Sequence, residues 1–140
     1  MAKNKWRVGA ALQGNKRALL LRMFRPKFAR VYCPSLTYAY GVGPDYKFPE
    51  DKLDLRITGV HRTDTTEALV CTVNGQTHRP DGRRFHITLS TDGAAPATAG
   101  DIDDARIEPV NPVLVSFLRC TREKLRPAKF EHNAQARAAA

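Results

Sequence analysis

Apolar and polar residues alternate most regularly in the middle of the chain. Residues 52–60 (KLDLRITGV) place two leucines and an isoleucine on one face of a strand, with charged or polar residues on the other. A polar turn at 63–66 (TDTT) and a second apolar segment at 67–73 (EALVCTV) follow. This pattern predicts a β-hairpin.

Other segments have the β-branched and aromatic content that is typical of strands. They are 6–12 (WRVGAAL), 30–42 (RVYCPSLTYAYGV), 85–90 (FHITLS) and 113–118 (VLVSFL). Residues 16–24 (KRALLLRMF) favour a helix, with Asn15 as the expected N-cap and Pro26 at its end. A strand, a helix and then several strands predict an α+β fold with one or two helices and mostly antiparallel sheets.

The length of 140 residues fits a single domain, which we expect to span residues 1–122. Residues 123–140 are basic and rich in alanine, which predicts a frayed or disordered tail. No apolar segment has the length of a membrane span, and we recognise no signal peptide.

The three cysteines, Cys33, Cys71 and Cys120, lie far apart in the sequence. Their spacing does not match a zinc site, and their odd number argues against a secreted disulfide framework. We expect reduced thiols in or near the core, an intracellular, cytoplasmic protein, and no metal or other cofactor.

The net charge of +9 is concentrated at the two ends of the chain. Residues 1–44 contain nine lysines or arginines and no acidic residue, and residues 119–140 contain six basic and two acidic residues. Between them, residues 45–118 contain eight basic and twelve acidic residues. If the ends meet in space they form one basic patch, as is typical of nucleic-acid binding. The same charge also fits a soluble surface without a specific partner.

Segment 85–90 (FHITLS) contains the residues best suited to chemistry. His86 and Thr88 point to the same face of an alternating strand. An imidazole transfers protons near neutral pH, and a hydroxyl donates a hydrogen bond to a phosphate oxygen. The pair therefore suits a phosphodiester, although a single strand histidine is more often structural.

Segment 33–42 (CPSLTYAYGV) has the same local pattern with serine in place of histidine. Ser35 and Thr37 share one face of a strand, and the two motifs lie 51 positions apart. Together the segments resemble the paired H-x-T motifs of the 2H phosphoesterase superfamily, in particular its short branch associated with RNA repair and RNA ligation. The resemblance extends from Trp6 to Leu118.

That resemblance implies a bilobal α+β fold with a central cleft. In that family, one histidine acts as general base and the other as general acid on a 2′,3′-cyclic or 3′,5′-phosphodiester. The threonines bind the phosphate, and no metal is required. By this resemblance, His86, Thr88, Ser35 and Thr37 form the candidate phosphate cleft.

Ser35 replaces the first histidine of the family, and a serine does not exchange a proton near pH 7 without a partner base. Three interpretations remain open. The protein is inactive and keeps the cleft for binding, or His61 or His78 approaches from a loop and replaces the lost group, or His86 alone supports slow chemistry. His132 lies in the expected tail and is not a candidate.

Basic and aromatic residues are the expected contacts to nucleic acid. The loop before the second motif supplies arginines for phosphate, the first helix supplies long-range attraction, and tyrosines offer rings on which bases stack. The expected contacts are Lys16, Arg17, Arg22, Arg25, Arg79, Arg83, Arg84, Tyr38 and Tyr40. The alternate positions of Tyr38 and Tyr40 predict that they share one strand face.

The sequence favours an RNA-binding protein on a 2H-like scaffold with a degraded catalytic pair. One alternative is an active, metal-independent phosphodiesterase that acts through His86 on 2′,3′-cyclic phosphate ends of RNA or on cyclic nucleotides or oligonucleotides. The other is an interaction protein whose basic surface binds an acidic protein. If the protein binds RNA, its affinity for RNA is expected to weaken as salt is added.

Overall fold

The computed structural model of this chain describes residues 6–12, 14–33, 35–49 and 53–125, without the side chains of residues 116–118. These residues form an α+β fold with one α-helix and antiparallel sheets. The elements, in chain order, are β1 (Trp6–Ala11), α1 (Gly14–Phe24), β2 (Arg30–Val31), β3 (Ser35–Val42), β4 (Leu53–Arg62), β5 (Thr66–Val73), β6 (His86–Thr91), the 3-10 helices η2 (Pro96–Gly100) and η3 (Asp104–Arg106), β7 (Ile107–Leu118) and β8 (Thr121–Lys124). None of the described helices is long and apolar enough to cross a membrane.

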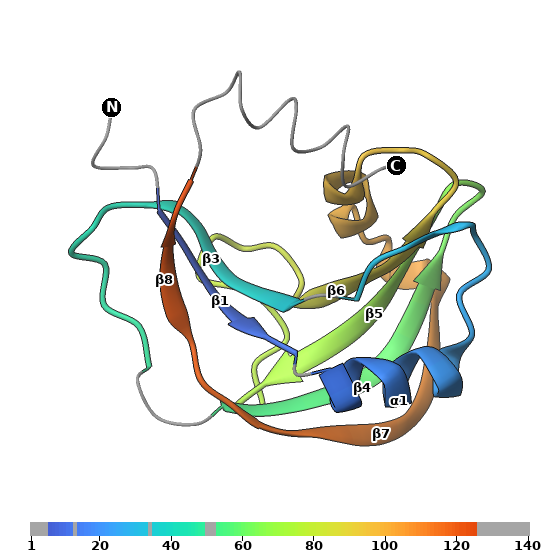
Figure 1. The fold of residues 1–140 in the computed structure, drawn as a ribbon, viewed down its shortest axis with the longest axis horizontal. Coiled ribbons are helices and arrows are strands. Elements are labelled where there is room, and N and C mark those ends of the chain that lie inside the picture. Colours follow the sequence, from blue (N-terminus) through green and yellow to red (C-terminus); the bar gives the residue numbers. More distant parts are fainter. Residues whose placement is uncertain (1–5, 13, 34, 50–52, 126–140) are drawn as a thin grey trace.

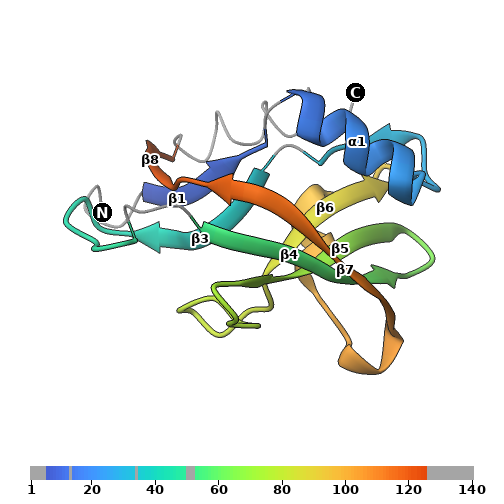
Figure 2. The same ribbon diagram turned by 90° about the horizontal axis from the view of Figure 1, so that it is seen from below.

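The strands form two sheets, and the chain crosses from one sheet to the other several times. The smaller sheet has the strand order β3-β1-β8, and the larger has the order β2-β6-β5-β4-β7. β7 ends in the larger sheet, and β8 begins in the smaller one only three positions later. Figures 1 and 2 show α1 and the smaller sheet side by side over one face of the larger sheet.

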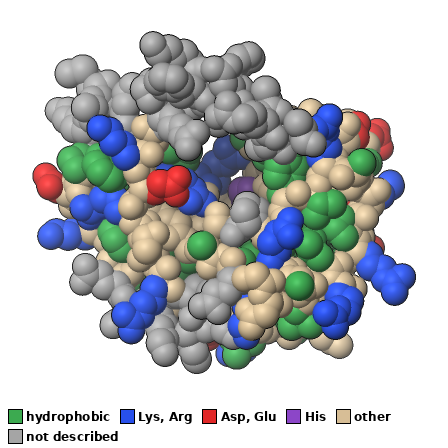
Figure 3. Space-filling model, viewed as in Figure 1, with side chains coloured by type: hydrophobic (Ala, Val, Ile, Leu, Met, Phe, Trp, Pro, Cys, Tyr) green, Lys and Arg blue, Asp and Glu red, His purple; other side chains and the backbone are tan. Residues whose placement is uncertain are grey.

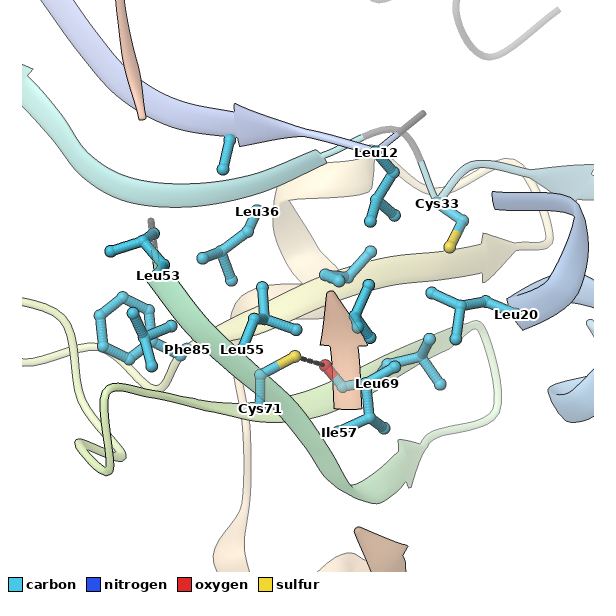
Figure 4. Close-up of a cluster of buried hydrophobic side chains, with 14 of the residues drawn as sticks. Leu12, Leu20, Cys33, Leu36, Leu53, Leu55, Ile57, Leu69, Cys71 and Phe85 are labelled. Carbon is cyan, nitrogen blue, oxygen red and sulfur yellow. Dashed lines mark hydrogen bonds between the residues drawn. The ribbon is translucent and has the colours of Figure 1, made fainter. Parts of the chain in front are cut away.

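The hydrophobic core fills the space between these layers (Figure 4). Leu20 of α1 and Leu36 of β3 point toward Leu55, Ile57 and Leu69 of the larger sheet, and all five side chains are buried. Burial of each large aliphatic side chain contributes roughly 1.5–3 kcal/mol. Because the inner face of β4 is covered, the alternation predicted for residues 52–60 is present in the structure.

The segment predicted as one strand over residues 30–42 is instead two strands in different sheets. β2 pairs with β6 in the larger sheet, whereas β3 pairs with β1 in the smaller one. Between them, Cys33 has a φ of 63°, a left-handed conformation that turns the chain out of the larger sheet. The prediction of a single strand was therefore wrong; Pro34 lies outside the described residues.

The two ends of the domain also differ from the prediction. α1 begins at Gly14, so Asn15 lies in its first turn and is not the N-cap. β8 runs across the expected domain boundary at residue 122 and pairs with β1, with Trp6 opposite Lys124. All four residues of β8 are exposed, so no apolar alternation marks this strand in the sequence. The rest of the expected tail, residues 126–140, lies outside the described residues.

Candidate functional site

A cavity of about 430 Å³ opens between the strands that carry the two motifs. Ser35 and Thr37 of β3 and His86 and Thr88 of β6 all line it, so the structure brings the two motifs together. Figure 3 shows a hollow near the middle of this face, with a histidine and Lys or Arg side chains inside it. The other residues that line the cavity are Arg7, Tyr32, Tyr40, Arg79, Arg83, Pro96 and Ala97.

The pairing of β2 with β6 explains why the motifs converge. This antiparallel pairing continues beyond β2, where the Cys33 N–H donates to the Thr88 carbonyl oxygen at 2.7 Å. Ser35, the first residue of β3, follows only two positions after this contact. Since the chain turns at Cys33, it leaves the larger sheet beside the second motif, and β3 forms the facing wall of the cavity.

His86 has one ring nitrogen fixed by the backbone. Its Nδ1 lies 3.0 Å from the Arg84 carbonyl oxygen, which only accepts hydrogen bonds, so Nδ1 carries a proton. Burial is the main cause that lowers the pKa of His86 below its usual value, and the nearby Arg79 and Arg83 act in the same direction. The ring is therefore neutral at pH 7 with a lone pair on Nε2, which is the protonation state of a general base.

η2 approaches the His86 ring closely. A Cβ on Gly100 would lie 2.8 Å from His86 Cε1, 3.0 Å from His86 Nε2 and 2.7 Å from a terminal nitrogen of Arg83. Thr88 is tied to the same element, because its hydroxyl donates to the Pro96 carbonyl oxygen at 3.3 Å. Glycine at position 100 thus leaves room for the imidazole. The hydroxyl proton of Thr88 points to the Pro96 carbonyl oxygen and not into the cavity.

Arg7, which the sequence analysis did not select, lies along the first motif. Its Nε donates to Thr37 Oγ1 at 2.9 Å, and a terminal nitrogen donates to Ser35 Oγ at 2.7 Å. Burial lowers the pKa of this guanidinium, but an arginine remains charged at neutral pH. The only signal in the sequence is an arginine after Trp6 in an otherwise apolar strand.

Two further guanidinium groups reach the cavity from the loop before β6. Arg79 is held by Asp81 through two hydrogen bonds, one of them from Nε at 3.0 Å. A terminal nitrogen of Arg83 donates to the exposed Asp101 at 3.1 Å. Both arginines were on the predicted list of contacts, and their carboxylate partners offset part of the positive charge.

The other predicted basic contacts do not line the cavity. This group consists of Lys16, Arg17, Arg22, Arg25 and Arg84. Arg17 Nε donates to the Tyr32 carbonyl oxygen at 2.9 Å, and the Arg84 side chain lies 3.7 Å from Asp104. These residues make no direct contact with the cavity, so they attract a bound anion only by longer-range electrostatic interaction.

Tyr38 and Tyr40 do not share a face, contrary to the prediction. Thr37 lies opposite Gly9 of β1 and Ala39 lies opposite Val8, so Tyr38 is an extra residue in a β-bulge. Such a bulge reverses the alternation of side chains. The ring of Tyr38 accordingly packs 5.8 Å from that of Phe85 in a separate pocket, whereas Tyr40 lines the cavity.

Neither His61 nor His78 lines the cavity, so neither stands in for the missing histidine. His61 belongs to β4, which is separated from β6 by β5, and its Nε2 accepts the Asp103 N–H at 3.0 Å. His78 Nδ1 lies 2.7 Å from the neighbouring Thr77 hydroxyl on an exposed loop. His86 is the only histidine of the described chain that lines the cavity.

No protein-family model, curated protein or solved structure matches this chain. The geometry of the cavity is therefore the basis for a functional assignment. The described residues contain no group of three or more His, Cys, Asp or Glu placed to hold a metal ion. The three cysteines are free and buried, and burial raises the pKa of Cys33 and of Cys120 to about 11, which keeps both thiols protonated at pH 7.

Proposed function

We propose that the protein binds RNA by holding a phosphate group in the cavity, on a bilobal scaffold like that of the 2H phosphoesterases. The observation that carries this proposal is the convergence of both motifs on a cavity that three guanidinium groups also line. Phosphate oxygens accept charge-assisted hydrogen bonds from guanidinium groups and hydroxyls, so a phosphodiester matches this lining.

RNA rather than another phosphate compound is favoured by the surroundings of the cavity. Tyr40 lies at the cavity and is 53% exposed, so its ring can stack with an unpaired base. The basic residues of α1 and the overall charge of +9 attract a polyanion over longer distances. The three free, buried cysteines suit the reducing cytoplasm, where such an RNA partner is found.

Catalysis by a pair of histidines is impaired in this proposal. Ser35 accepts a hydrogen bond from Arg7, which has no lone pair and cannot act as a base for the serine. In this proposal the first motif binds the phosphate of the ligand but lacks a group that exchanges protons near neutral pH. We therefore propose an RNA-binding protein that has a scaffold like that of the 2H phosphoesterases but lacks their pair of catalytic histidines.

Binding of a fluorescent single-stranded RNA oligonucleotide to wild type, Arg83→Gln and Arg56→Gln tests this function. Arg83 lines the cavity, whereas the exposed Arg56 pairs with Asp54 and does not line it. We expect Arg83→Gln to weaken binding by roughly tenfold and Arg56→Gln to change it little. We also expect affinity to fall steadily as salt is added, because phosphate contacts release counterions. RNA affinity that is insensitive to salt and to Arg83→Gln would contradict the proposal.

An active phosphodiesterase is a second candidate, favoured by the protonation state of His86. The lone pair on its Nε2 would accept a proton from water as the water oxygen attacks the phosphorus of a 2′,3′-cyclic phosphate. The bond from phosphorus to O2′ or O3′ would then break, and the leaving oxygen would take its proton from solvent. Turnover of RNA with a 2′,3′-cyclic phosphate end, or of cyclic dinucleotides, that His86→Ala abolishes would establish this activity, and its absence in wild type would exclude it.

A further inference from the structure

The charge of Arg7 is only weakly compensated by the protein. Its side chain is 19% exposed, and the nearest carboxylate oxygen among the described residues, on Glu123, lies 3.6 Å away on a side chain that is 67% exposed. Arg79, by contrast, makes two hydrogen bonds to Asp81. A charge that is withdrawn from water without a close partner is costly, so Arg7 is well placed to receive an anion.

The hydrogen bonds of Arg7 also determine where the hydroxyl protons of the first motif point. A guanidinium has donors only, so Ser35 Oγ and Thr37 Oγ1 both accept from it. Each hydroxyl keeps its own proton for another acceptor, and both residues line the cavity. Thr88, in the second motif, differs because its proton is donated to the Pro96 carbonyl oxygen. Donors for an anion are thus gathered at the first motif.

Tyr32 provides an independent sign that an acceptor belongs in this cavity. Tyr32 lines the cavity, and its hydroxyl oxygen is buried without a hydrogen-bond partner among the described residues. A buried polar group that lacks a partner costs free energy, and such groups often face a ligand. The Tyr32 hydroxyl is therefore a candidate donor to a ligand in the cavity.

Gly9 allows Arg7 to adopt its position. A Cβ at residue 9 would lie 2.6 Å from a terminal nitrogen of Arg7, 2.8 Å from its Cζ and 2.8 Å from the Leu36 carbonyl oxygen. A larger residue would therefore displace both the guanidinium and the backbone of β3. The glycine two residues after Arg7 keeps the guanidinium close to the hydroxyls of the first motif.

We propose that Arg7, with the hydroxyls of Ser35, Thr37 and Tyr32, forms an anion-binding site that takes the place of the missing histidine. This inference rests on the proposed function and assigns its phosphate to one wall of the cavity. The ligand is the phosphate group of a nucleotide or of RNA. Since a guanidinium keeps its charge and has no lone pair, this wall binds the phosphate and leaves proton transfer to the wall of His86.

The test measures the affinity of uridine 3′-monophosphate, uridine and a single-stranded RNA oligonucleotide for wild type, Arg7→Gln, Arg7→Lys, Tyr32→Phe and the surface control Arg56→Gln. We expect Arg7→Gln to weaken binding of the monophosphate and of RNA by roughly tenfold or more. Arg7→Lys should show an intermediate loss because an ammonium cannot form the same fork of hydrogen bonds. Tyr32→Phe should weaken binding by about threefold to tenfold, and Arg56→Gln should bind as wild type does.

A melting curve without ligand separates binding from a structural role. Because the charge of Arg7 is weakly compensated, we expect Arg7→Gln to melt at the wild-type temperature or above it. Should Arg7→Gln fail to fold, Arg7→Lys and Tyr32→Phe carry the test. A lower melting temperature of Arg7→Gln together with wild-type affinity in Arg7→Lys and Tyr32→Phe would show that Arg7 is structural and would overturn the inference.

The three ligands distinguish failure of this inference from failure of the proposed function. RNA binding that is equal in wild type, Arg7→Gln and Tyr32→Phe would overturn the anion site and leave RNA binding intact. Binding of the monophosphate that requires Arg7, without binding of RNA, would support the site and reject RNA as the partner. Uridine that binds as tightly as its monophosphate, or no binding by any of the three, would reject a phosphate site.

Discussion

At the scale of single residues, the proton on His86 sets the charge of one wall of the cavity. Burial lowers its pKa, as do Arg79 and Arg83, whereas the hydrogen bond to Arg84 and the charge of Asp101 raise it. A bound phosphate adds a negative charge beside the ring and raises the pKa further. Binding of an anion and protonation of His86 are therefore coupled.

We predict that RNA affinity rises as the pH is lowered from 8 to 5. A phosphodiester keeps its charge over this range, so the change comes from the protein. A bound phosphate that raises the pKa of His86 by about one unit gives roughly a tenfold gain in affinity. His86→Gln should remove most of the pH dependence, as measured by fluorescence anisotropy at constant salt. If His86→Gln retains the full pH dependence of RNA affinity, another titrating group causes that dependence.

Glu67 is a second residue whose charge matters, here for stability. It is fully buried, and its carboxylate accepts hydrogen bonds from Arg62 Nε at 2.6 Å, from the Ser90 hydroxyl at 2.5 Å and from the Lys27 N–H at 2.6 Å. Glu67 thus joins β5 to β4, to β6 and to the segment that follows α1. Buried donors lose their acceptor if this carboxylate is removed.

We predict that Glu67→Ala lowers the free energy of unfolding by about 3 kcal/mol. Glu108→Ala is the matched control, because the 68% exposed Glu108 contacts the same arginine at 3.3 Å. Exposed ion pairs contribute little, so this control should stay within about 0.5 kcal/mol of wild type. Urea denaturation of the three proteins measures the difference. Equal effects of the two substitutions would contradict the role given to Glu67.

At the scale of elements, η2 holds the second motif in place. Its Gly100 lies against the His86 ring, and its Pro96 carbonyl accepts the Thr88 proton. The element also lies against β5 and β6 of the larger sheet, and its Ala99 is buried. The position of η2 therefore controls how the imidazole faces the cavity.

We predict that Gly100→Ala displaces the His86 ring and weakens RNA binding by about threefold to tenfold, while the fold remains intact. The added Cβ would lie within 3.0 Å of the ring, a distance at which something must shift. Gly14→Ala is the control, since a Cβ at Gly14 meets no atom within 4 Å. The chemical shifts of the His86 ring, measured by NMR, report the displacement directly. An unchanged ring environment in Gly100→Ala would contradict the close approach.

At the scale of the whole molecule, the buried His61 and the half-buried His86 make stability depend on pH. Burial is the main cause that lowers the pKa of both His61 and His86 below the ordinary value of 6.5. Between that lowered pKa and 6.5 the unfolded chain binds more protons than the folded one, so acid favours unfolding. Asp81 acts in a separate window, because hydrogen bonds from Arg79 lower its pKa below 3.8.

We predict that the free energy of unfolding is at its full value above about pH 6.5 and falls as the pH decreases toward 5. Each histidine contributes about 1.4 kcal/mol for every unit by which folding lowers its pKa. His61→Asn should flatten the dependence in this window, whereas Asp81→Asn should leave the slope in this window unchanged and alter it only below about pH 4. Urea denaturation at several pH values measures both slopes. A free energy of unfolding that rises as the pH is lowered from 6.5 to 5 would contradict this prediction.

The sequence by itself determined those features that arise from neighbouring residues. The alternation in residues 52–60 and the apolar segment 67–73 indicated the hairpin of β4 and β5, and residues 16–24 indicated α1. The same periodicity placed His86 with Thr88 and Ser35 with Thr37 on single strand faces. A strand side chain alternates because of its own backbone, so these predictions needed no knowledge of distant contacts.

Only the tertiary structure decided which distant residues meet. Arg7 contacts Thr37 over 30 positions of sequence, and β8 is a strand because its exposed residues pair with the free edge of β1. The left-handed Cys33 divided a predicted strand, and the bulge at Tyr38 reversed an expected side-chain direction. Register, bulges and burial depend on how separate segments pack together, and local periodicity carries no information about that packing.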